Sequence, residues 1–555
     1  MTEIKVKASV KVKASAEDIF QTILESRGHK TKAEQQAFLH PAEPTIALLL
    51  KESGLKKSTL NQAQKLLDTH LKACHDICVF GDYDADGVSA TAIMWQGITA
   101  YAKLQKSASR ILPFIPDRHK HGYGLGTKAV AEVISGEAFG STKHAQFSPA
   151  LIITVDTGIV AHDGIKSFKA ARIDVIITDH HLPVEATLPP AEHIIHSTAT
   201  SGAGVAWITT LHLLGEPAMK LLDLATIGVV GDMMPLVGLN RTICVSGLAA
   251  LSTTHRPGLV AMKQSMGVGD KSLTTYDISF GIAPRINAAG RIYNPLDALR
   301  LLCTSDAKLA IELAVKIESH NKDRQEYTDR ALKLAAAEQV SHKIIVLTGD
   351  YHEGVIGLVA GKLTELFHRP AIVMSNNGEV IKGSARSVPG VNITDLLRSL
   401  KTPFLGLGGH DQAAGFSLAH DQLTAMQAEI ENLADKTIDD NRLVKHYSAD
   451  IEIGLSATTM SLAKLIGELE PFGMGNPKPK FLITDLNVLE DRQLGSEGKH
   501  RKLTVEQNGV TRELMLFNAK QPYPLRSIKA VICTLDINTW RDKQSLQLIA
   551  SYVET

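Results

Sequence analysis

Acidic and histidine side chains directly follow three short apolar runs of this chain. Phe80 leads into GDYDADG at residues 81–87, Val155 leads into Asp156, and Thr178 leads into Asp179-His180-His181. If these runs are parallel strands, their carboxyl ends line one crevice, and the polar groups converge there. So many carboxylates repel one another unless a cation neutralises them. Oxygen and imidazole ligands together favour Mn²⁺ or Mg²⁺ over a thiolate-bound metal.

A fourth acid and several alternatives bear on this interpretation. A later apolar stretch, residues 224–230, delivers Asp232. DxDxDG also opens an EF-hand loop, but position 12 of such a loop would be Ile93 rather than Glu. Taken alone, Asp156 could be a helix cap and the two histidines a surface pair. Gly361-Lys362 is not part of a phosphate-binding loop, because Leu363 stands where Ser or Thr is required.

The elements that must position these residues read as an α/β fold. Residues 77–80, 151–155 and 175–178 are continuous apolar runs, and residues 87–104 have helical spacing. Such strands favour a parallel sheet covered by helices on both faces. A helix over about 306–340 follows, with two helices broken near His320-Asn321 as the alternative. A second α/β unit begins near Ile344, and the short strands after 447 predict a small OB-like β-barrel.

Length and composition indicate the number of domains, the overall charge and the redox compartment. A chain of 555 residues suggests several domains. We expect an N-terminal extension at 1–45, a catalytic domain at 46–295, a connecting helix at 296–340, a second α/β domain at 341–435 and a barrel at 446–555. The formal net charge is zero, so attraction to nucleic acid would need a local basic patch. Five cysteines without a paired spacing suit a reducing compartment.

The N-terminus and the hydropathy suggest where the protein works. No apolar run reaches about 18 residues, so no membrane span is expected. Residues 1–15 alternate polar and apolar side chains without a signal core, which favours a short edge strand or a frayed arm. Cytoplasm is the expected location.

The motifs resemble those of the DHH phosphoesterase family, in its RecJ-type exonuclease branch. GDYDADG, VDTG at 155–158, the DHH triplet and GDMMPL at 231–236 with Asn240-Arg241 occur in family order. APRINAAGR at 283–291 is similar to the segment that closes the catalytic core. Residues 344–432 resemble the DHH-associated domain, and PFGMGNP at 471–477 resembles the entry to an OB-type barrel. The resemblance covers nearly the whole chain.

The resemblance implies roles for individual residues. The metal ligands would be Asp84, Asp86, Asp156, His180 and Asp232, and the catalytic groups beside them Asp82, Asp179 and His181. The nucleic-acid-binding residues would be Arg118, Tyr123, Arg285, Asn287, Arg291, Ser384, Arg386 and His410. The barrel offers further basic and aromatic groups: Lys478, Lys480, His500, Arg501, Lys502, Trp540 and Arg541. For each arginine the alternative is a surface ion pair, and for the barrel set a solvated face.

Two positions depart from the family pattern. Some members place a His where this chain has Phe80, and relatives often show Asn-Pro where this chain has His196-Ser197.

The function implied is a single-stranded-DNA-specific 5′-to-3′ exonuclease that uses two Mn²⁺ or Mg²⁺ ions, releases 5′-mononucleotides and serves DNA repair and recombination. Single-stranded DNA would be its substrate, a single-strand-binding protein and a helicase its partners, and a monomer its state. Two rival functions are a small-molecule pyrophosphatase or oligonucleotide phosphatase and a non-catalytic scaffold. The first would lack the connecting helix and the barrel, and the second should have lost some of the motif acids.

Overall fold

The computed structural model describes residues 4–8, 14–122, 124–140, 146–183, 187–269, 271–335, 341–495, 498–519, 527–540 and 543–555. Tyr123 and Arg541, two of the predicted nucleic-acid contacts, lie outside these residues. The chain forms two compact units. One comprises Met1–Glu43, Pro235–Val245 and His446–Thr555, and the other comprises Pro44–Met234 and Ser246–Lys445.

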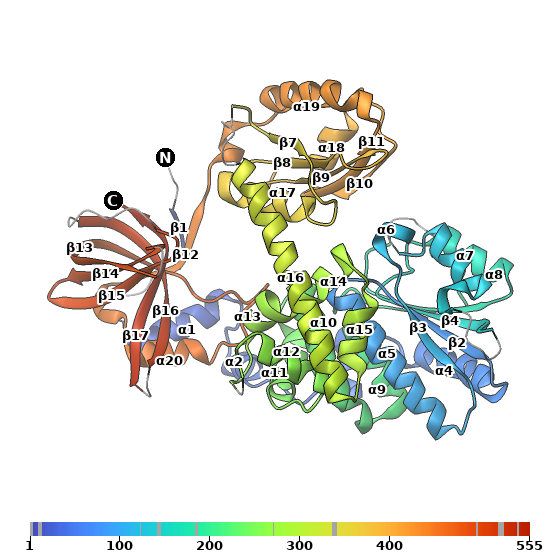
Figure 1. Cartoon of the computed structure of the whole chain (residues 1–555). Helices are drawn as coiled ribbons and strands as arrows, with labels where there is room; N and C mark the ends of the chain where they lie inside the picture. Colours follow the sequence, from blue (N-terminus) through green and yellow to red (C-terminus); the bar gives the residue numbers. More distant parts are fainter. Residues whose placement is uncertain are drawn as a thin grey trace. The chain divides into compact units, whose positions relative to one another are not determined.

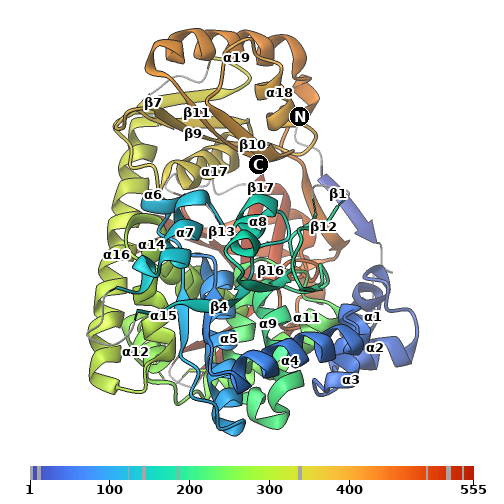
Figure 2. The same ribbon diagram turned by 90° about the vertical axis from the view of Figure 1, so that its right-hand side faces the viewer.

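A five-stranded parallel sheet forms the first α/β part of the larger unit. Its order is β3 (Ile111–Phe114), β2 (Asp76–Phe80), β4 (Pro149–Val155), β5 (Asp174–Asp179) and β6 (His193–His196). α7 (Thr127–Ser135) and α8 (His162–Ala170) lie on one side of it, and α4 (Lys57–Lys72) on the other (Figures 1 and 2). α5 (Ala85–Leu104) and α9 (Gly202–Leu214) pack beside each other and against this sheet. Both faces are covered, as the continuous apolar strands predict.

Helices follow this sheet in the chain. They are α10 (Leu222–Gly231), α11 (Gly238–Ser252), α12 (Pro257–Ser265), α13 (Thr275–Asp277), the π-helical segment η3 (Ile278–Ile282), α14 (Ala283–Ile292), α15 (Leu296–Cys303) and α16 (Ala307–Ala335). α16 continues through His320 and Asn321, so the alternative of a break there is wrong. Residues 336–340 of the predicted helix lie outside the described residues.

The second α/β part has a mixed sheet. Its order is β10 (Gly406–His410), β11 (Ala413–Leu418), β9 (Ile381–Arg386), β8 (Ala371–Ser375) and β7 (Ile345–Gly349), of which only the β7–β8 pairing is parallel. α18 (Ile393–Arg398) and α19 (Leu423–Thr437) share a core with one face. α17 (Ile356–Phe367) covers the other face, where Ile345, Leu347 and Val373 point.

The smaller unit is built on a closed five-stranded barrel. β13 (Phe481–Leu494), β14 (His500–Gln507), β15 (Val510–Leu516), β17 (Lys543–Glu554) and β16 (Ser527–Trp540) follow one another, and β13 pairs with β16 to close the ring. β12 (Tyr447–Glu452) extends this sheet, and β1 (Ile4–Ala8) pairs with β12 as the predicted edge strand. The predicted fold class, two α/β parts joined by a long helix and followed by an OB-like barrel, is confirmed.

Arg241 joins the separate segments of the smaller unit. Its guanidinium is buried and donates to the backbone carbonyls of Phe38, Leu469 and Glu470. It also stacks on the Phe38 ring, with 3.9 Å between the guanidinium carbon and the ring centroid. α1 (Ala16–Ser26) packs against α20 (Met460–Gly467) in the same core. A buried guanidinium that donates to three backbone carbonyls stabilises the fold. This structural role explains why the motif has an arginine at position 241.

The remaining α-helices of the described residues are α2 (Lys32–Leu39), α3 (Ile46–Ser53) and the short α6 (Arg118–His121). Among the described residues, no helix is both long and apolar enough to span a lipid bilayer.

Candidate active site

The loop after β2 is shaped by its own acids. Asp84 is the N-cap of α5, and its Oδ1 accepts hydrogen bonds from the backbone N–H groups of Asp86 (3.0 Å) and Gly87 (2.9 Å). A capping carboxylate is held in one conformation and lies at the positive end of the helix dipole. The sequence DxDG therefore turns the chain from strand to helix and presents Asp84 and Asp86 beside the strand end.

Asp86 is also held by a second helix. Its Oδ2 accepts from the N–H of Gly202 at 2.7 Å, and its Oδ1 accepts from the N–H of Ala203 at 2.9 Å. These amides belong to the first turn of α9, so its dipole favours the charged carboxylate. Glycines permit the close approach: a Cβ on Gly228 would lie 2.3 Å from Asp86 Oδ1, and one on Gly202 would lie 2.3 Å from Asp156 Oδ1.

Asp156 stands at the end of β4 in a strained backbone conformation. Its φ is +58°, in the left-handed region that costs energy for a residue with a Cβ. The side chain is buried, and Oδ1 lies 3.1 Å from Nε2 of His180. This Oδ1 has no hydrogen bond that meets normal geometry. Strain of this kind is kept where the surrounding structure requires one particular side-chain direction.

Asp179 orients its neighbours. Its Oδ2 accepts from the N–H of Ile159 at 2.8 Å, and its Oδ1 accepts from the N–H of His180 at 2.7 Å. The same Oδ1 lies 2.8 Å from Nδ1 of His181. With these bonds made, Asp179 fixes the directions of both histidines and of the loop after β4. In the triplet, both carboxylate oxygens of Asp179 therefore accept hydrogen bonds, and the imidazoles of His180 and His181 extend from the end of β5.

His180 and Asp232 complete the cluster. Nε2 of His180 lies 3.7 Å from Asp232 Oδ2 and 3.8 Å from Asp86 Oδ2. Three sets of side chains hold potential ligand atoms within 4.8 Å of one another: Asp86, His180 and Asp232; Asp82, Asp84 and Asp156; and Asp156, His180 and His181. All predicted metal and catalytic residues except Asp179 belong to at least one set. The sequence thus correctly predicted which groups lie together.

The electrostatics of the cluster fit a cation. Burial and the neighbouring Asp84 raise the pKa of Asp82 to about 7, and burial and Asp86 raise that of Asp232 to about 8. Burial likewise raises the pKa of Asp156 well above its usual value and lowers that of His180. Buried carboxyls that repel one another, with a neutral imidazole beside them, form a donor set suited to a hard divalent ion.

Asp179 and His181 behave as a pair. Burial alone would raise the pKa of Asp179, but the hydrogen bond and charge of His181, together with the backbone N–H groups of Ile159 and His181, outweigh burial and lower it. The same hydrogen bond raises the pKa of His181 to about 9. The His181 side chain is half exposed, so it can meet a ligand at the rim of the cluster as a cation.

α14, which carries the predicted residues Arg285, Asn287 and Arg291, packs against the first motif. Asn287 Oδ1 accepts from the N–H of Ala85 at 2.7 Å, so this side chain holds the motif loop. A Cβ on Gly290 would lie 2.5 Å from the carbonyl oxygen of Tyr83, so the helix backbone approaches that loop closely. Burial and the neighbouring Asp86 raise the pKa of Asp84, and the charge of Arg291 partly offsets this rise, which indicates that the guanidinium lies near the cluster.

Arg324 of α16 lies near two arginines of α14, Arg285 and Arg291. Nε of Arg285 donates to Glu318 Oε2 at 2.6 Å, and Nη1 donates to the carbonyl of Gly281. Arg324 on α16 was not predicted. Burial and the positive charges of Arg291 and Arg285 lower its pKa, and its buried Nε has no hydrogen-bond partner. Burial and mutual repulsion of these positive charges are unfavourable, so the site favours the binding of an anion between them. Helical spacing alone gave no signal for Arg324.

The other predicted contacts are spread over both α/β parts. The guanidinium carbon of Arg118 lies 5.9 Å from the centroid of the Tyr83 ring in the first motif. In β9, Arg386 Nη1 donates to Ser384 Oγ at 3.2 Å and to the carbonyl of Ala385. A Cβ on Gly357 would lie 3.1 Å from Ser384 Oγ and 3.2 Å from Arg386 Nη2, so the first turn of α17 adjoins both side chains. His410 is exposed in β10.

Three of the basic barrel residues that the sequence suggested form ion pairs. Lys478 pairs with Asp536, Arg501 with Asp491 and Lys502 with Glu513. His500 contacts the exposed ring of Phe517 edge to face, with 5.2 Å between centroids. The solvated-face alternative accounts for the paired residues.

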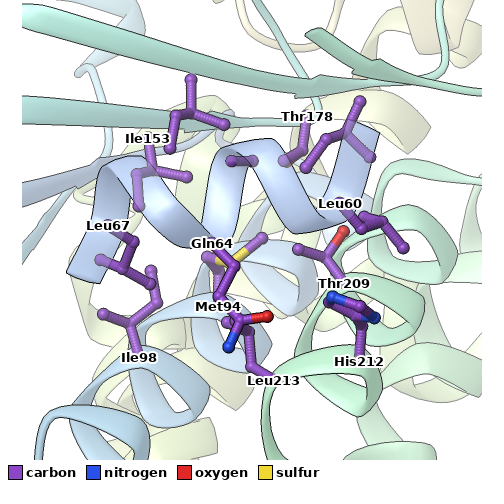
Figure 3. A pocket seen from close by; sticks show the side chains of 13 residues that line it. Leu60, Gln64, Leu67, Met94, Ile98, Ile153, Thr178, Thr209, His212 and Leu213 are labelled. Atoms are coloured by element: carbon purple, nitrogen blue, oxygen red, sulfur yellow. The ribbon is translucent and has the colours of Figure 1, made fainter. Parts of the chain in front are cut away.

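An apolar cavity below the sheet is separate from this chemistry. It lies between α4, α5, α9 and the strands, with a volume of only about 20 Å³, and Figure 3 shows its lining side chains. The polar ones are Gln64, Thr178, Thr209 and His212, and no acidic residue lines it. An apolar lining without a carboxylate does not suit a second cation site.

Family models match three parts of the chain. The model for the N-terminal domain of the DHH family matches residues 76–229, the DHHA1 domain matches 341–436, and the RecJ OB domain matches 449–552. Together these models account for both α/β parts and the barrel.

Named relatives are similar over most of the chain. Single-stranded-DNA-specific exonuclease RecJ of Bacillus subtilis is 33% identical over 97% of this chain and 69% of its own length. The protein of that name from Haemophilus influenzae is 31% identical over 89% of this chain and 90% of its own length. A crystal structure of RecJ in complex with Mn²⁺ from Thermus thermophilus covers 100% of this chain and 79% of that chain, with a TM-score of 0.82 and 29% identity.

Proposed function

The chain belongs to the RecJ family of DHH phosphoesterases, and from that premise we propose that it is a metal-dependent exonuclease that degrades single-stranded DNA. The observation that carries the proposal is the cluster of carboxylates and imidazoles at the ends of β2, β4 and β5. The named relatives are single-stranded-DNA-specific exonucleases, and similar RecJ structures contain Mn²⁺ or Mg²⁺. The rival functions do not account for the barrel and the complete set of acids together.

Two divalent ions are the second part of the proposal. Two sets of ligands without a shared residue, Asp86–His180–Asp232 and Asp82–Asp84–Asp156, support two ion positions. Asp84, Asp86, Asp156, His180 and Asp232 would hold the ions, and Asp82 would act beside them as a ligand or a water-orienting group. When bound, the ions supply Lewis acidity at the scissile phosphate and a nucleophile from bound water at neutral pH.

The residues around the cluster have roles of their own in this mechanism. Asp179 holds His181 by Nδ1, and the charged His181 donates a hydrogen bond to a phosphate oxygen. Arg291 and Arg324 bind the neighbouring phosphates of the strand, and Arg118 binds near the first motif. Asn287 positions the loop that carries Asp84. Each of these actions fixes the substrate relative to the acids, which is a large part of the catalytic effect in such sites.

Direction and product complete the proposal. Degradation would run 5′ to 3′ and release 5′-mononucleotides, with Ser384, Arg386 and the first turn of α17 binding the terminal phosphate. Arginine and backbone amides are suited to a phosphate dianion. A role in DNA repair and recombination, the protein partners, the monomeric state, the domain bounds and a cytoplasmic location remain predictions.

Digestion of single-stranded DNA labelled at either end tests the function directly. With Mn²⁺, the 5′ label should appear at once in mononucleotides, while the 3′ label passes through progressively shorter strands. Blunt duplex of the same sequence and a chelated reaction are the controls. Absence of Mn²⁺-dependent cleavage would refute the proposed activity, and early release of the 3′ label would refute the direction alone.

A further inference from the structure

Two large aromatic side chains stand exposed next to each other on the larger unit. Tyr276 of α13 is 68% exposed and Phe280 of η3 is 69% exposed. Their ring centroids are 4.6 Å apart with an interplanar angle of 32°. A single exposed apolar residue is ordinary, but two adjacent aromatic rings left in water form a surface that suits a ligand.

The protein presents these rings on a rigid element. A capping box between Thr274 and Asp277 starts the helix, and Ile278 and Ile282 anchor its other face in the core. A Cβ on Gly281 would lie 2.2 Å from the methyl carbon of Met266, so the backbone is packed directly on that side chain. Phe280 lies in the π-helical turn between these anchors, and Tyr276 lies four residues before it in α13. Such turns are frequent at functional sites.

The pair lies close to the proposed catalytic groups. η3 continues without a break into α14, which carries Arg285 and Arg291. Ala283, three residues after Phe280, approaches Gly231, because a Cβ on Gly231 would lie 3.6 Å from that of Ala283. Gly231 immediately precedes Asp232 of the metal cluster. A strand that extends from the acids past α14 and η3 would meet the two rings.

We propose that Tyr276 and Phe280 form a stacking platform for the bases of the single strand that approaches the metal cluster, an inference that rests on the proposed function. Every base has a π face, so stacking on an aromatic ring is strong and tolerant of sequence. Bases in a duplex already stack on one another and do not offer these faces. The platform would thus favour unpaired DNA, while the arginines bind phosphates in any strand.

Steady-state cleavage by Phe280→Ala, on intact strands and on strands with one abasic position, tests the platform. The wild-type protein should show a KM raised roughly fivefold to 100-fold by an abasic residue at the position that meets the ring, the usual range for one stacked base. On the intact strand Phe280→Ala should show a similar rise with kcat nearly unchanged. On the matching abasic strand it should show no further rise.

Three controls separate stacking from other effects. Phe280→Trp should restore the wild-type KM, because the ring is kept, and Phe367→Ala should change nothing, because Phe367 is an exposed ring at the end of α17. The dependence of KM on salt should be the same in Phe280→Ala and wild type, since no phosphate contact is lost.

Two outcomes would overturn the platform, and one would overturn the function instead. If Phe280→Ala raises KM equally for intact and abasic strands at every position tested, the rings contact no base and serve protein packing instead. The same conclusion follows if Phe280→Ala matches wild type on both. If the wild-type protein itself cleaves no single-stranded DNA, the proposed function fails before the platform is tested.

Discussion

The two α/β sheets of the larger unit present opposite charges at their proposed working positions. The parallel sheet gathers Asp179 at the end of β5, and Asp82 and Asp156 just beyond the ends of β2 and β4. The mixed sheet carries Ser384 and Arg386 inside β9, two residues apart and therefore on one face, beside α17. Loops at the ends of parallel strands can bring many carboxylates together, whereas a strand interior offers alternate side chains in a fixed row. We infer that the first sheet binds cations and the second a terminal phosphate.

The largest effect should come from the acidic sheet. Asp156→Asn removes a ligand common to two of the three ligand sets, and we expect cleavage to fall on the order of 1000-fold or more, because several kcal/mol of charge stabilisation are lost. The fold should remain, since one source of repulsion among buried acids is removed. Asp163→Asn, on a fully exposed side chain of α8, is the matched control. Cleavage near the wild-type rate in Asp156→Asn with Mn²⁺ would rule out its assignment.

Replacing Gly202 should lower the rate of cleavage almost as much as replacing an acid. The Cβ of Gly202→Ala would lie 2.3 Å from Asp156 Oδ1, so it would displace the Asp156 side chain from its place beside His180. A shift of about 1 Å in a catalytic group can cost about 100-fold in rate, and we expect a loss of that order in kcat. Gly467→Ala is the control, because a Cβ there meets nothing within 4 Å. Unchanged kcat in Gly202→Ala would show that the close packing around Asp156 has no catalytic role.

The basic sheet should give a smaller loss that depends on the substrate. Arg386→Ala should weaken transition-state binding of 5′-phosphorylated strands by about 1.5–3 kcal/mol, the worth of hydrogen bonds to a charged group. The loss in kcat/KM should shrink for strands with a 5′-hydroxyl, because the partner charge is absent, and the four combinations form a double-mutant cycle. Arg398→Ala, at the exposed end of α18, is the control. An equal loss for both strands would make Arg386 a general backbone contact.

The sequence predicted the acidic sheet better than the basic one for a local reason. An acid that follows a buried strand is read from adjacent residues, and the strand direction then places it. The partners of these acids are distant in sequence: Asp86 is held by the amides of Gly202 and Ala203, and the loop of Asp84 by Asn287. Arg324 lies in an ordinary helical pattern, and only packing brings it to Arg285 and Arg291.

The barrel unit shows the same limit of sequence-based prediction, because segments that are distant in sequence pack together in it. Its strands are visible in the sequence as short apolar runs, but residues 1–43 and 235–245 also belong to its compact unit. Arg241 links these segments through carbonyls of Phe38, Leu469 and Glu470. Deleting the chain after residue 445 would therefore strip a buried guanidinium of two of its acceptors. Substitutions on the barrel surface test its role in DNA binding without that cost.

The smallest predicted effect is a dependence of folding stability on pH, which arises from the raised pKa values of the acids of the parallel sheet. In metal-free protein the pKa values of Asp82 and Asp232 are raised to about 7 and about 8, above the value of about 4 for an unfolded chain. The folded state then binds more protons than the unfolded state between these values, so stability falls as pH rises from about 4 to about 8. His181, raised to about 9, acts in the same direction at higher pH. The lowered pKa of Asp179 acts only near and below pH 4.

Thermal melts of chelated protein at pH 6 and pH 8 measure this slope. We expect a lower Tm at pH 8, by a few degrees for each kcal/mol of stability lost. Asp82→Asn should flatten the slope, because the amide does not titrate, while Asp163→Asn should leave it unchanged. Saturating Mn²⁺ should raise Tm more at pH 8 than at pH 6, since the ion replaces protons that the carboxyls have lost. Equal Tm values at both pH values without metal would mean that neither burial nor mutual repulsion raises the pKa values of these acids, and the contrast between the two sheets would then lose its electrostatic basis.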